Sequence, residues 1–144
     1  MKTAVITAVD AADIAACRAI REEVFVHEQN VPADYEWDEH EATATHFLLH
    51  AGGEPVGTAR LRILGEVAKI ERVAIRKPAR GKGLGAVIMR HVLDIARRYP
   101  QVTTARLGGQ DNAIAFYKRL GFEICSDAYM EAGILHYDMK LALR

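Results

Sequence analysis

The spacing of apolar residues changes along the chain between a strand-like and a helix-like pattern. Apolar, often β-branched runs bounded by turn residues predict strands at 2–9, 46–51, 54–64, 67–75, 102–107, 122–125 and 135–143. Apolar positions that recur every three or four residues predict helices at about 10–25, 84–99 and 112–120. This order predicts an α/β (α+β) fold with one mixed sheet of about seven strands and helices on its faces.

Two consecutive segments interrupt the pattern before the second strand. Residues 25–32 lose the helical period and end at Pro32. Residues 33–45 are acidic and irregular, yet they include Tyr35 and Trp37. A run of acids is more often solvated surface, but a solvated loop rarely includes a tryptophan. We therefore interpret 33–45 as a loop or short helix that packs near a site.

A glycine-rich stretch, residues 80–85 (Arg-Gly-Lys-Gly-Leu-Gly), lies between the strand ending at Ile75 and the helix that follows. Glycines at every second position are costly inside a strand or helix, but they allow bare backbone N–H groups to approach a ligand. The start of a helix also favours an anion. Arg76, Lys77, Arg80 and Lys82 add positive charge. The stretch predicts a diphosphate-binding loop, and a merely flexible turn is the alternative.

Two common diphosphate motifs do not fit this stretch. A kinase-type P-loop requires a Ser or Thr after Gly-Lys, and here Lys82 is followed by Gly83. A dinucleotide fingerprint requires Gly-x-Gly-x-x-Gly after the first strand of its unit, whereas this stretch has Gly-x-Gly-x-Gly late in the chain.

Composition indicates one ordinary globular domain spanning residues 1–144. Half of the residues are apolar, 26% are charged and the net charge is zero, so there is no general attraction to nucleic acid or to an anionic membrane. Cys17 and Cys125 lie far apart without a metal-like spacing, which favours a reducing compartment. We find no signal peptide or long apolar span and expect a cytoplasmic protein.

A second motif spans residues 110–122, in which Phe116-Tyr117 is followed by Leu120-Gly121-Phe122. Together with Arg80-x-x-Gly83-x-Gly85 it resembles the signatures of the GNAT N-acetyltransferases. Residues 21–32, the triplet 71–73 and His136 further resemble the ElaA-like and YjcF-like subgroup. The resemblance covers nearly the whole chain. One departure is Gly108-Gly109, where a less glycine-rich strand end is expected.

The resemblance implies a mostly antiparallel sheet with helices on both faces and acetyl-CoA as the acyl donor. Main-chain groups of the strand before the glycine loop would hold the pantetheine arm, the loop would hold the diphosphate, and two residues of the second motif would also contact the cofactor. The implied cofactor-binding residues are Val73, Ala74, Ile75, Arg80, Gly81, Lys82, Gly83, Leu84, Gly85, Asn112 and Phe116. Ordinary core packing is the alternative for the strand residues, and helix capping is the alternative for Asn112.

Catalysis in this family implies a proton donor for the departing thiolate, and Tyr117 holds that position. A plain core tyrosine is the alternative. An amine acceptor is mostly protonated at neutral pH and must first lose a proton. Glu71 is the first candidate for the base, with an ion pair to Arg72 or a lysine as its alternative role. Glu28 and His136 are the other candidates, and a structural role is the alternative for His136.

We expect an acyl-CoA-dependent N-acyltransferase that transfers acetyl to a primary amine by direct attack in a ternary complex. Glu28, Gln29, Trp37 and His136 are the expected acceptor-side residues. The mechanism needs neither a covalent enzyme intermediate nor a metal. The acceptor class stays open among small amines, aminoglycosides, peptide N-termini and protein lysines. A homodimer is one expectation, since the last strands often form dimer contacts in this family. A non-catalytic acyl-CoA sensor is the alternative function.

Overall fold

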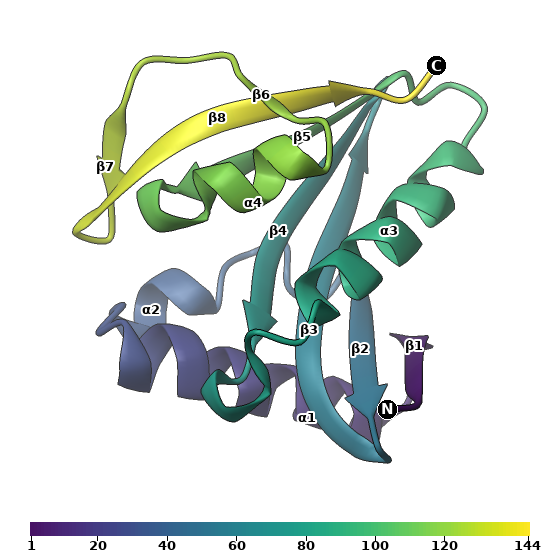
Figure 1. Cartoon of the computed structure of the whole chain (residues 1–144), viewed down its shortest axis with the longest axis vertical. Coiled ribbons are helices and arrows are strands. Elements are labelled where there is room, and N and C mark those ends of the chain that lie inside the picture. Colours follow the sequence, from purple (N-terminus) through teal and green to yellow (C-terminus); the bar gives the residue numbers. More distant parts are fainter.

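Eight strands form a single sheet in the computed structural model, which describes residues 1–144 (Figure 1). The spatial order is β1-β2-β3-β4-β5-β8-β6, and β7 pairs with β8. Only β4 and β5 run parallel, so the sheet is mostly antiparallel, as predicted. The strands are β1 (Thr3–Ala8), β2 (Thr45–Ala51), β3 (Glu54–Leu64), β4 (Val67–Ile75), β5 (Thr104–Gln110), β6 (Glu123–Ile124), β7 (Tyr129–Glu131) and β8 (Ile134–Ala142).

The helices begin close to the predicted positions. Asp10 caps the first helix by accepting a hydrogen bond from the Asp13 amide over 2.8 Å. The helices are α1 (Ala11–Arg21), the π-helix η1 (Glu22–Glu28), α2 (Ala33–Glu36), the 3₁₀ turn η2 (Lys77–Ala79), α3 (Leu84–Arg97), the 3₁₀ turn η3 (Asp111–Ala113) and α4 (Ile114–Arg119). None of them has the length and apolar content that a membrane span requires.

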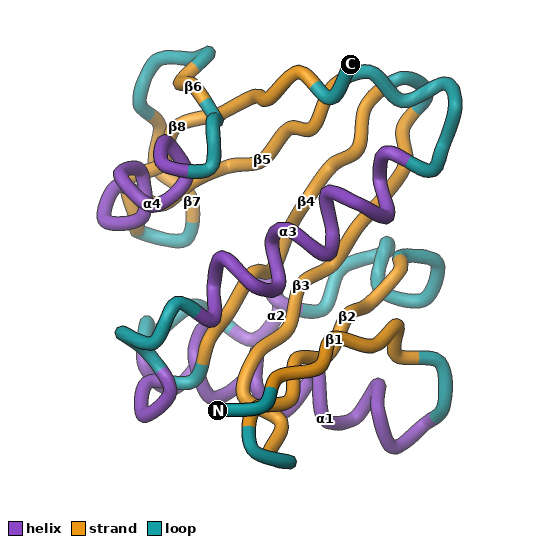
Figure 2. Tube along the Cα trace, turned by 45° about the vertical axis from the view of Figure 1, so that its right-hand side comes forward, coloured by secondary structure: helices purple, strands orange, loops and turns teal.

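Both faces of the sheet are covered, which explains the unbroken apolar run in β2 (Figure 2). Successive strand side chains point to opposite faces. Phe47 and Leu49 belong to the main core with α3, whereas Leu48 belongs to a smaller core with Cys17 and Ile20 of α1. The predicted layers, with helices on both faces, are confirmed.

The parallel contact between β4 and β5 is short and opens into a fork. The two strands pair only where Val67–Lys69 meets Thr104–Arg106. Beyond that point, residues 70–75 of β4 have β3 on one edge and no strand on the other. The β3–β4 register also shifts by one residue between Arg60 and Thr58, and Arg72 adopts φ 53°, a left-handed conformation typical of a bulge. The fork leaves backbone groups of β4 available to a ligand.

Three boundaries differ from the sequence-based prediction. The first helix does not stop at Phe25 but continues to Glu28 with wider π-helical turns, which explains why the 3.6-residue period disappears there. Strand β5 runs through Gly108 and Gly109 to Gln110. The polar connection at 126–133 contains β7, an eighth strand. It has only three residues, too few to give a recognisable pattern in the sequence.

Candidate active site

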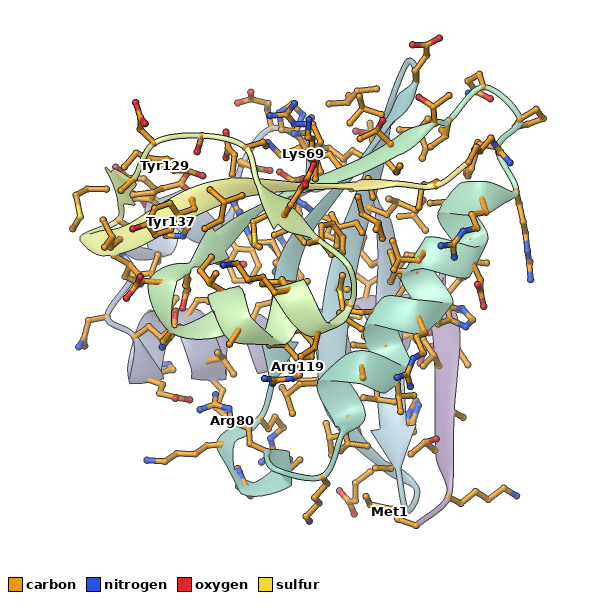
Figure 3. All side chains as sticks on the ribbon, turned by 45° about the horizontal axis from the view of Figure 1, so that its top comes forward. Met1, Lys69, Arg80, Arg119, Tyr129 and Tyr137 are labelled. Atoms are coloured by element: carbon orange, nitrogen blue, oxygen red, sulfur yellow. The ribbon has the colours of Figure 1, made fainter.

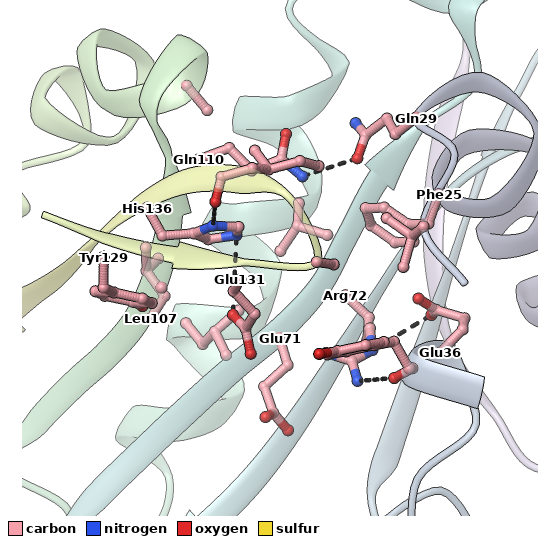
Figure 4. A pocket seen from close by; sticks show the side chains of 18 of the residues that line it. Phe25, Gln29, Glu36, Glu71, Arg72, Leu107, Gln110, Tyr129, Glu131 and His136 are labelled. Atoms are coloured by element: carbon pink, nitrogen blue, oxygen red, sulfur yellow. Dashed lines mark hydrogen bonds and ion pairs between the residues drawn. The ribbon is translucent and has the colours of Figure 1, made fainter. Parts of the chain in front are cut away.

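Two clefts meet in the fork between β4 and β5. The loop cleft, about 830 Å³, lies beside the glycine-rich loop and extends along α4. The fork cleft, about 280 Å³, lies between β4, η1, α2 and the β7–β8 hairpin (Figure 4). Six residues line both clefts: Gln29, Val73, Gln110, Ala113, Tyr117 and Ile134. The clefts therefore share a wall, and a molecule in one can touch a molecule in the other.

The glycine-rich loop has the backbone geometry that an anion site needs. Gly81 and Gly83 adopt φ 79° and 76°, values that side-chain-bearing residues rarely reach. Gly83 is the N-cap of α3 and provides no side-chain cap. The first N–H groups of this 14-residue helix therefore have no partner from a capping side chain. Together with the positive end of the helix dipole, they favour a phosphate in the loop cleft.

Phe116 explains the third glycine of the loop. A Cβ on Gly85 would lie 3.0 Å from Cζ of Phe116, so the aromatic ring packs directly on the start of α3. Both residues line the loop cleft together with Leu84 and Asn112. Asn112 is exposed in η3 and its side chain does not cap α4.

Basic side chains of the loop are held by carboxylates of η1. Arg80 donates to Glu28 over 2.7 Å and to the Ile75 carbonyl over 2.9 Å, and Arg76 pairs with Glu23 at 2.9 Å. Lys82 is exposed beside the loop. Arg119 of α4 also lines the loop cleft and forms no ion pair (Figure 3). The sequence analysis missed Arg119, because nothing in the local sequence shows that the end of α4 returns to this loop.

Tyr117 lies in the shared wall and is nearly buried, with 8% of its surface exposed. The rings of Phe116 and Phe122 contact it edge-on, at centroid distances of 5.0 and 6.0 Å. Its hydroxyl makes no hydrogen bond within the chain. Burial raises the pKa of the Tyr117 phenol to about 12. The phenol is therefore protonated at neutral pH and able to donate that proton.

Gly109 makes room for this tyrosine. A Cβ at Gly109 would lie 3.3 Å from Cδ2 of Tyr117 and 3.2 Å from both Ile114 Cδ1 and Met139 Sδ. The φ of Gly109 is not in the left-handed region, so the glycine serves close packing rather than an unusual backbone conformation. The unexpected Gly108-Gly109 pair thus has a steric reason in the wall of the site.

Strand β4 contributes residues to both clefts. Val73, Ala74 and Ile75 line the loop cleft, and Val73 also lines the fork cleft. These residues lie on the part of β4 that β5 does not pair with, so one row of backbone groups is open to a strand-like ligand. The structure brings these predicted cofactor-binding residues together with the glycine loop.

Glu71 lines the fork cleft, but arginines hold its carboxylate. Arg62 donates to it over 2.7 and 3.2 Å, and Arg60 donates over 3.1 and 3.2 Å. Burial by itself would raise the pKa of Glu71, but the Arg62 hydrogen bond and the charges of both arginines outweigh it and lower that pKa. The partners are Arg60 and Arg62, not the neighbouring Arg72. This arrangement makes Glu71 a weak base.

The structure places the four predicted acceptor-side residues in different parts of the molecule. Gln29 lines both clefts and accepts a hydrogen bond from Gln110 over 2.8 Å. His136 lines the fork cleft, whereas Glu28 lies in the loop cleft. Trp37 lines neither cleft, and the guanidinium groups of Arg18 and Arg21 cover its ring at 4.8 and 4.9 Å. Of the four, Gln29 and His136 line the fork cleft.

The β7–β8 hairpin supplies further residues that the sequence analysis missed. Tyr129 and Glu131 of β7 line the fork cleft beside His136 of β8 (Figure 4). Tyr129 stacks on His136 with ring centroids 5.7 Å apart and donates to Asp138 over 2.7 Å. Ala132 and Gly133 both have positive φ in the turn of this hairpin. Gly133 is the one sequence signal that could have indicated the turn.

A loop whose geometry favours an anion and a protonated phenol beside a second cleft are the arrangement that a transferase needs to bring a phosphate-bearing donor and an acceptor together. The chain belongs to the Acetyltransferase (GNAT) family, whose model matches residues 12–122. Among curated relatives, it is 39% identical to the uncharacterized N-acetyltransferase YjcF of Bacillus subtilis over 121 residues, which are 83% of this chain and 86% of YjcF. It is 31% identical to ElaA of Escherichia coli over 120 residues, which are 81% of this chain and 78% of ElaA.

Solved structures agree with this assignment. A protein from Lactobacillus plantarum that is described as an N-acetyltransferase superposes over all of both chains with a TM-score of 0.91 and 27% identity. The E. coli ElaA structure has a TM-score of 0.84 and 26% identity over 96% of this chain and 97% of ElaA. The resemblance to the ElaA-like and YjcF-like proteins is confirmed. Family membership implies acyl transfer from an acyl-CoA to an acceptor.

Proposed function

We propose that this protein transfers an acetyl group from acetyl-CoA to a primary amine by direct attack, with both substrates bound at once. The observation that carries this proposal is the position of Tyr117. Its unbonded, protonated hydroxyl lies in the wall shared by the loop cleft and the fork cleft. A proton donor at this junction suits a reaction in which a thiolate leaves one cleft as a nitrogen attacks from the other.

The residues of the loop cleft fit coenzyme A. The N–H groups at the start of α3 would bind its diphosphate, with charge from Arg80, Lys82 and Arg119. The open backbone edge at residues 73–75 would hold the pantetheine arm in the manner of an added strand. Asn112 and Phe116 would cover the arm from the side of α4.

The chain's own groups would then perform three tasks. Backbone N–H groups near Val73 would polarise the thioester carbonyl, because fixed donors stabilise charge that develops on oxygen. Tyr117 would give its phenolic proton to sulfur. Gln29 and Gln110 would orient the reacting groups at the junction of the clefts. Glu71 as the base stays a prediction, and its two arginine partners argue against it.

The direct test is CoA release from acetyl-CoA across a panel of amines that includes small monoamines, diamines, aminoglycosides, peptides with free N-termini and lysine peptides. We expect turnover with at least one class and intersecting initial-rate lines, which indicate a ternary complex. Mass spectrometry of the product should show acetyl on nitrogen. A wild-type protein that binds acetyl-CoA but acetylates none of these amines would support the sensor function instead.

A further inference from the structure

His136 occupies a position in the fork cleft that the proposed reaction leaves without a role. It is 8% exposed and lines the cleft together with Glu71 and Glu131 (Figure 4). The acceptor amine needs a base, because an ammonium has no lone pair with which to attack. The carboxylates of Glu71 and Glu28 are both held by arginines. Lys69 and the His136 imidazole are the other basic side chains in the lining of the cleft, and of these two side-chain types imidazole is the usual general base near neutral pH.

The hydrogen bond at Nδ1 fixes which nitrogen of His136 is basic. Nδ1 lies 2.7 Å from the carbonyl oxygen of Ile134. A carbonyl oxygen only accepts, so Nδ1 carries the hydrogen and donates it. In the neutral ring the lone pair therefore lies on Nε2. Nε2 makes no hydrogen bond, and the nearest charged group is the Glu131 carboxylate at 3.9 Å.

The ring is also held in place by its neighbours. Tyr129 stacks on it with an interplanar angle of 19°, and Asp138 fixes the Tyr129 hydroxyl at 2.7 Å. Gly108 makes this stack possible, since a Cβ there would lie 2.7 Å from the Tyr129 hydroxyl and 4.0 Å from Cδ2 of His136. The second unexpected glycine of β5 thus creates the space for an oriented imidazole.

We propose that His136 Nε2 is the general base that takes a proton from the acceptor ammonium, and that Glu131 stabilises the resulting imidazolium and attracts the cationic acceptor. This inference rests on the proposed function. Glu131 is suited to the task because its carboxylate is half exposed and its only ionic partner is His136. A carboxylate in this position attracts a positively charged substrate.

The groups already named account for every proton that moves in the reaction. The ammonium gives its first proton to His136 Nε2, the C–N bond forms and the C–S bond breaks. Sulfur receives the phenolic proton of Tyr117, and the Tyr117 phenolate takes the second proton from nitrogen. His136 then returns its proton to solvent through the open side of the fork cleft.

The charged and titratable groups around His136 come from five elements, and several of them are already paired. Glu36 of α2 pairs with Arg21, Glu71 of β4 pairs with two arginines, and Arg72 of β4 pairs with Asp38. Tyr129 of β7 donates to Asp138 of β8, and burial together with this bond raises the pKa of Tyr129. Tyr35 of α2, Lys69 of β4, Tyr117 of α4 and Glu131 of β7 complete this set of groups.

The test compares wild type with His136→Asn, because an asparagine amide N–H can replace Nδ1–H at the Ile134 carbonyl but supplies no base. We expect kcat/KM for the amine to fall by about 100-fold or more. The Kd for CoA should stay at the wild-type value, and urea unfolding should show a folded protein that has lost only the stack on Tyr129. The wild-type rate should rise with pH across the range in which histidines titrate, and this acidic limb should be absent in His136→Asn.

A second variant, Glu131→Gln, should raise KM for a cationic amine several-fold, because the fork cleft loses the carboxylate that attracts it. Nitrogen-15 NMR of the unliganded wild-type protein gives a readout that is independent of activity, and we expect the neutral ring with its hydrogen on Nδ1. Hydrogen on Nε2, or equal rates and pH profiles for wild type and His136→Asn, would overturn the role of His136 alone. A wild type that acetylates no amine would overturn the proposed function, and this role with it.

Discussion

Glu28 and Arg80 form a two-pronged ion pair that joins η1 to the glycine-rich loop. Arg80 Nη2 donates to Glu28 Oε1 over 2.7 Å, and its Nη1 donates to the other carboxylate oxygen. The hydrogen bonds from Arg80 lower the pKa of Glu28, so the carboxylate is charged at neutral pH. An arginine that is expected to bind phosphate is therefore held by an acid of the same chain.

Glu28→Gln should tighten CoA binding several-fold, because Arg80 would no longer have to leave a charged partner. Arg80→Gln should weaken binding by roughly tenfold, the effect of losing a charged hydrogen bond. Isothermal titration of CoA measures both. Glu23→Gln is the matched control, since Glu23 pairs with Arg76, which does not line the loop cleft. Equal affinity in wild type and Glu28→Gln would show that Arg80 does not exchange partners.

Tyr117→Phe should lower kcat by about 100-fold or more while the Kd for CoA stays near the wild-type value. The variant removes a hydroxyl that makes no hydrogen bond in the free protein, so its fold and its loop cleft should be intact. Since the phenol pKa is about 12, the wild-type protein should show no alkaline loss of activity from Tyr117 below about pH 11. Unchanged turnover in Tyr117→Phe would exclude Tyr117 as the proton donor.

Gly108→Ala should destabilise the protein by about 1–3 kcal/mol, because the new methyl group would lie 2.7 Å from the Tyr129 hydroxyl. Urea unfolding measures the change. A double-mutant cycle provides the control, since Tyr129→Phe removes the atom that clashes. We expect Gly108→Ala to cost less in the Tyr129→Phe background than in wild type. Additive effects would mean that the clash with this hydroxyl is not the cause.

The free energy of unfolding should decrease at acidic pH, because a buried network of charged residues around Arg60 loses its charge pairs. Arg60 is 0% exposed. Arg60 pairs with Asp38, Glu41 and Glu71. The pKa of Asp38 is lowered mainly by its hydrogen bonds from Arg60, and arginine partners outweigh burial in lowering the pKa values of Glu41 and Glu71. Because the folded values lie below the unfolded values of about 4, the network stabilises the protein above that pH and loses this contribution as pH falls.

Urea unfolding at pH 7, 5 and 3 measures this loss. Arg60→Met should lower the free energy of unfolding at pH 7 by about 3 kcal/mol or more, because it leaves carboxylates without their partner. Its stability should also depend less on pH between 5 and 3 than that of wild type. A wild-type protein that is equally stable at pH 7 and pH 3 would contradict this account.

Local patterns were sufficient to predict the elements that line the loop cleft. The glycine-rich loop, the start of α3 and α4 each depend on residues close together in sequence, whereas their roles toward a cofactor are implied by the family resemblance and stay predictions. The predicted sheet and its two covered faces are confirmed. They could be predicted because the spacing of apolar residues is a local property that indicates which face of an element each residue occupies.

The acceptor side depends on contacts between distant segments, which spacing does not reveal. Glu71 meets Arg60 because the β3–β4 register places them opposite each other, and a one-residue bulge sets that register. Trp37 is covered by arginines from α1, although its place among acids indicated a site. Strand β7 has only three residues, too few for a recognisable alternation, so Tyr129 and Glu131 were missed.

The shared wall between the loop cleft and the fork cleft has a consequence for substrate choice. Six residues belong to both clefts, and the fork cleft measures only about 280 Å³. Every methylene added to the acyl chain would occupy volume that the acceptor also needs. A longer acyl chain on the donor should therefore leave less room for the acceptor. With a propionyl or butyryl donor, the protein should accept only smaller amines than it accepts with an acetyl donor.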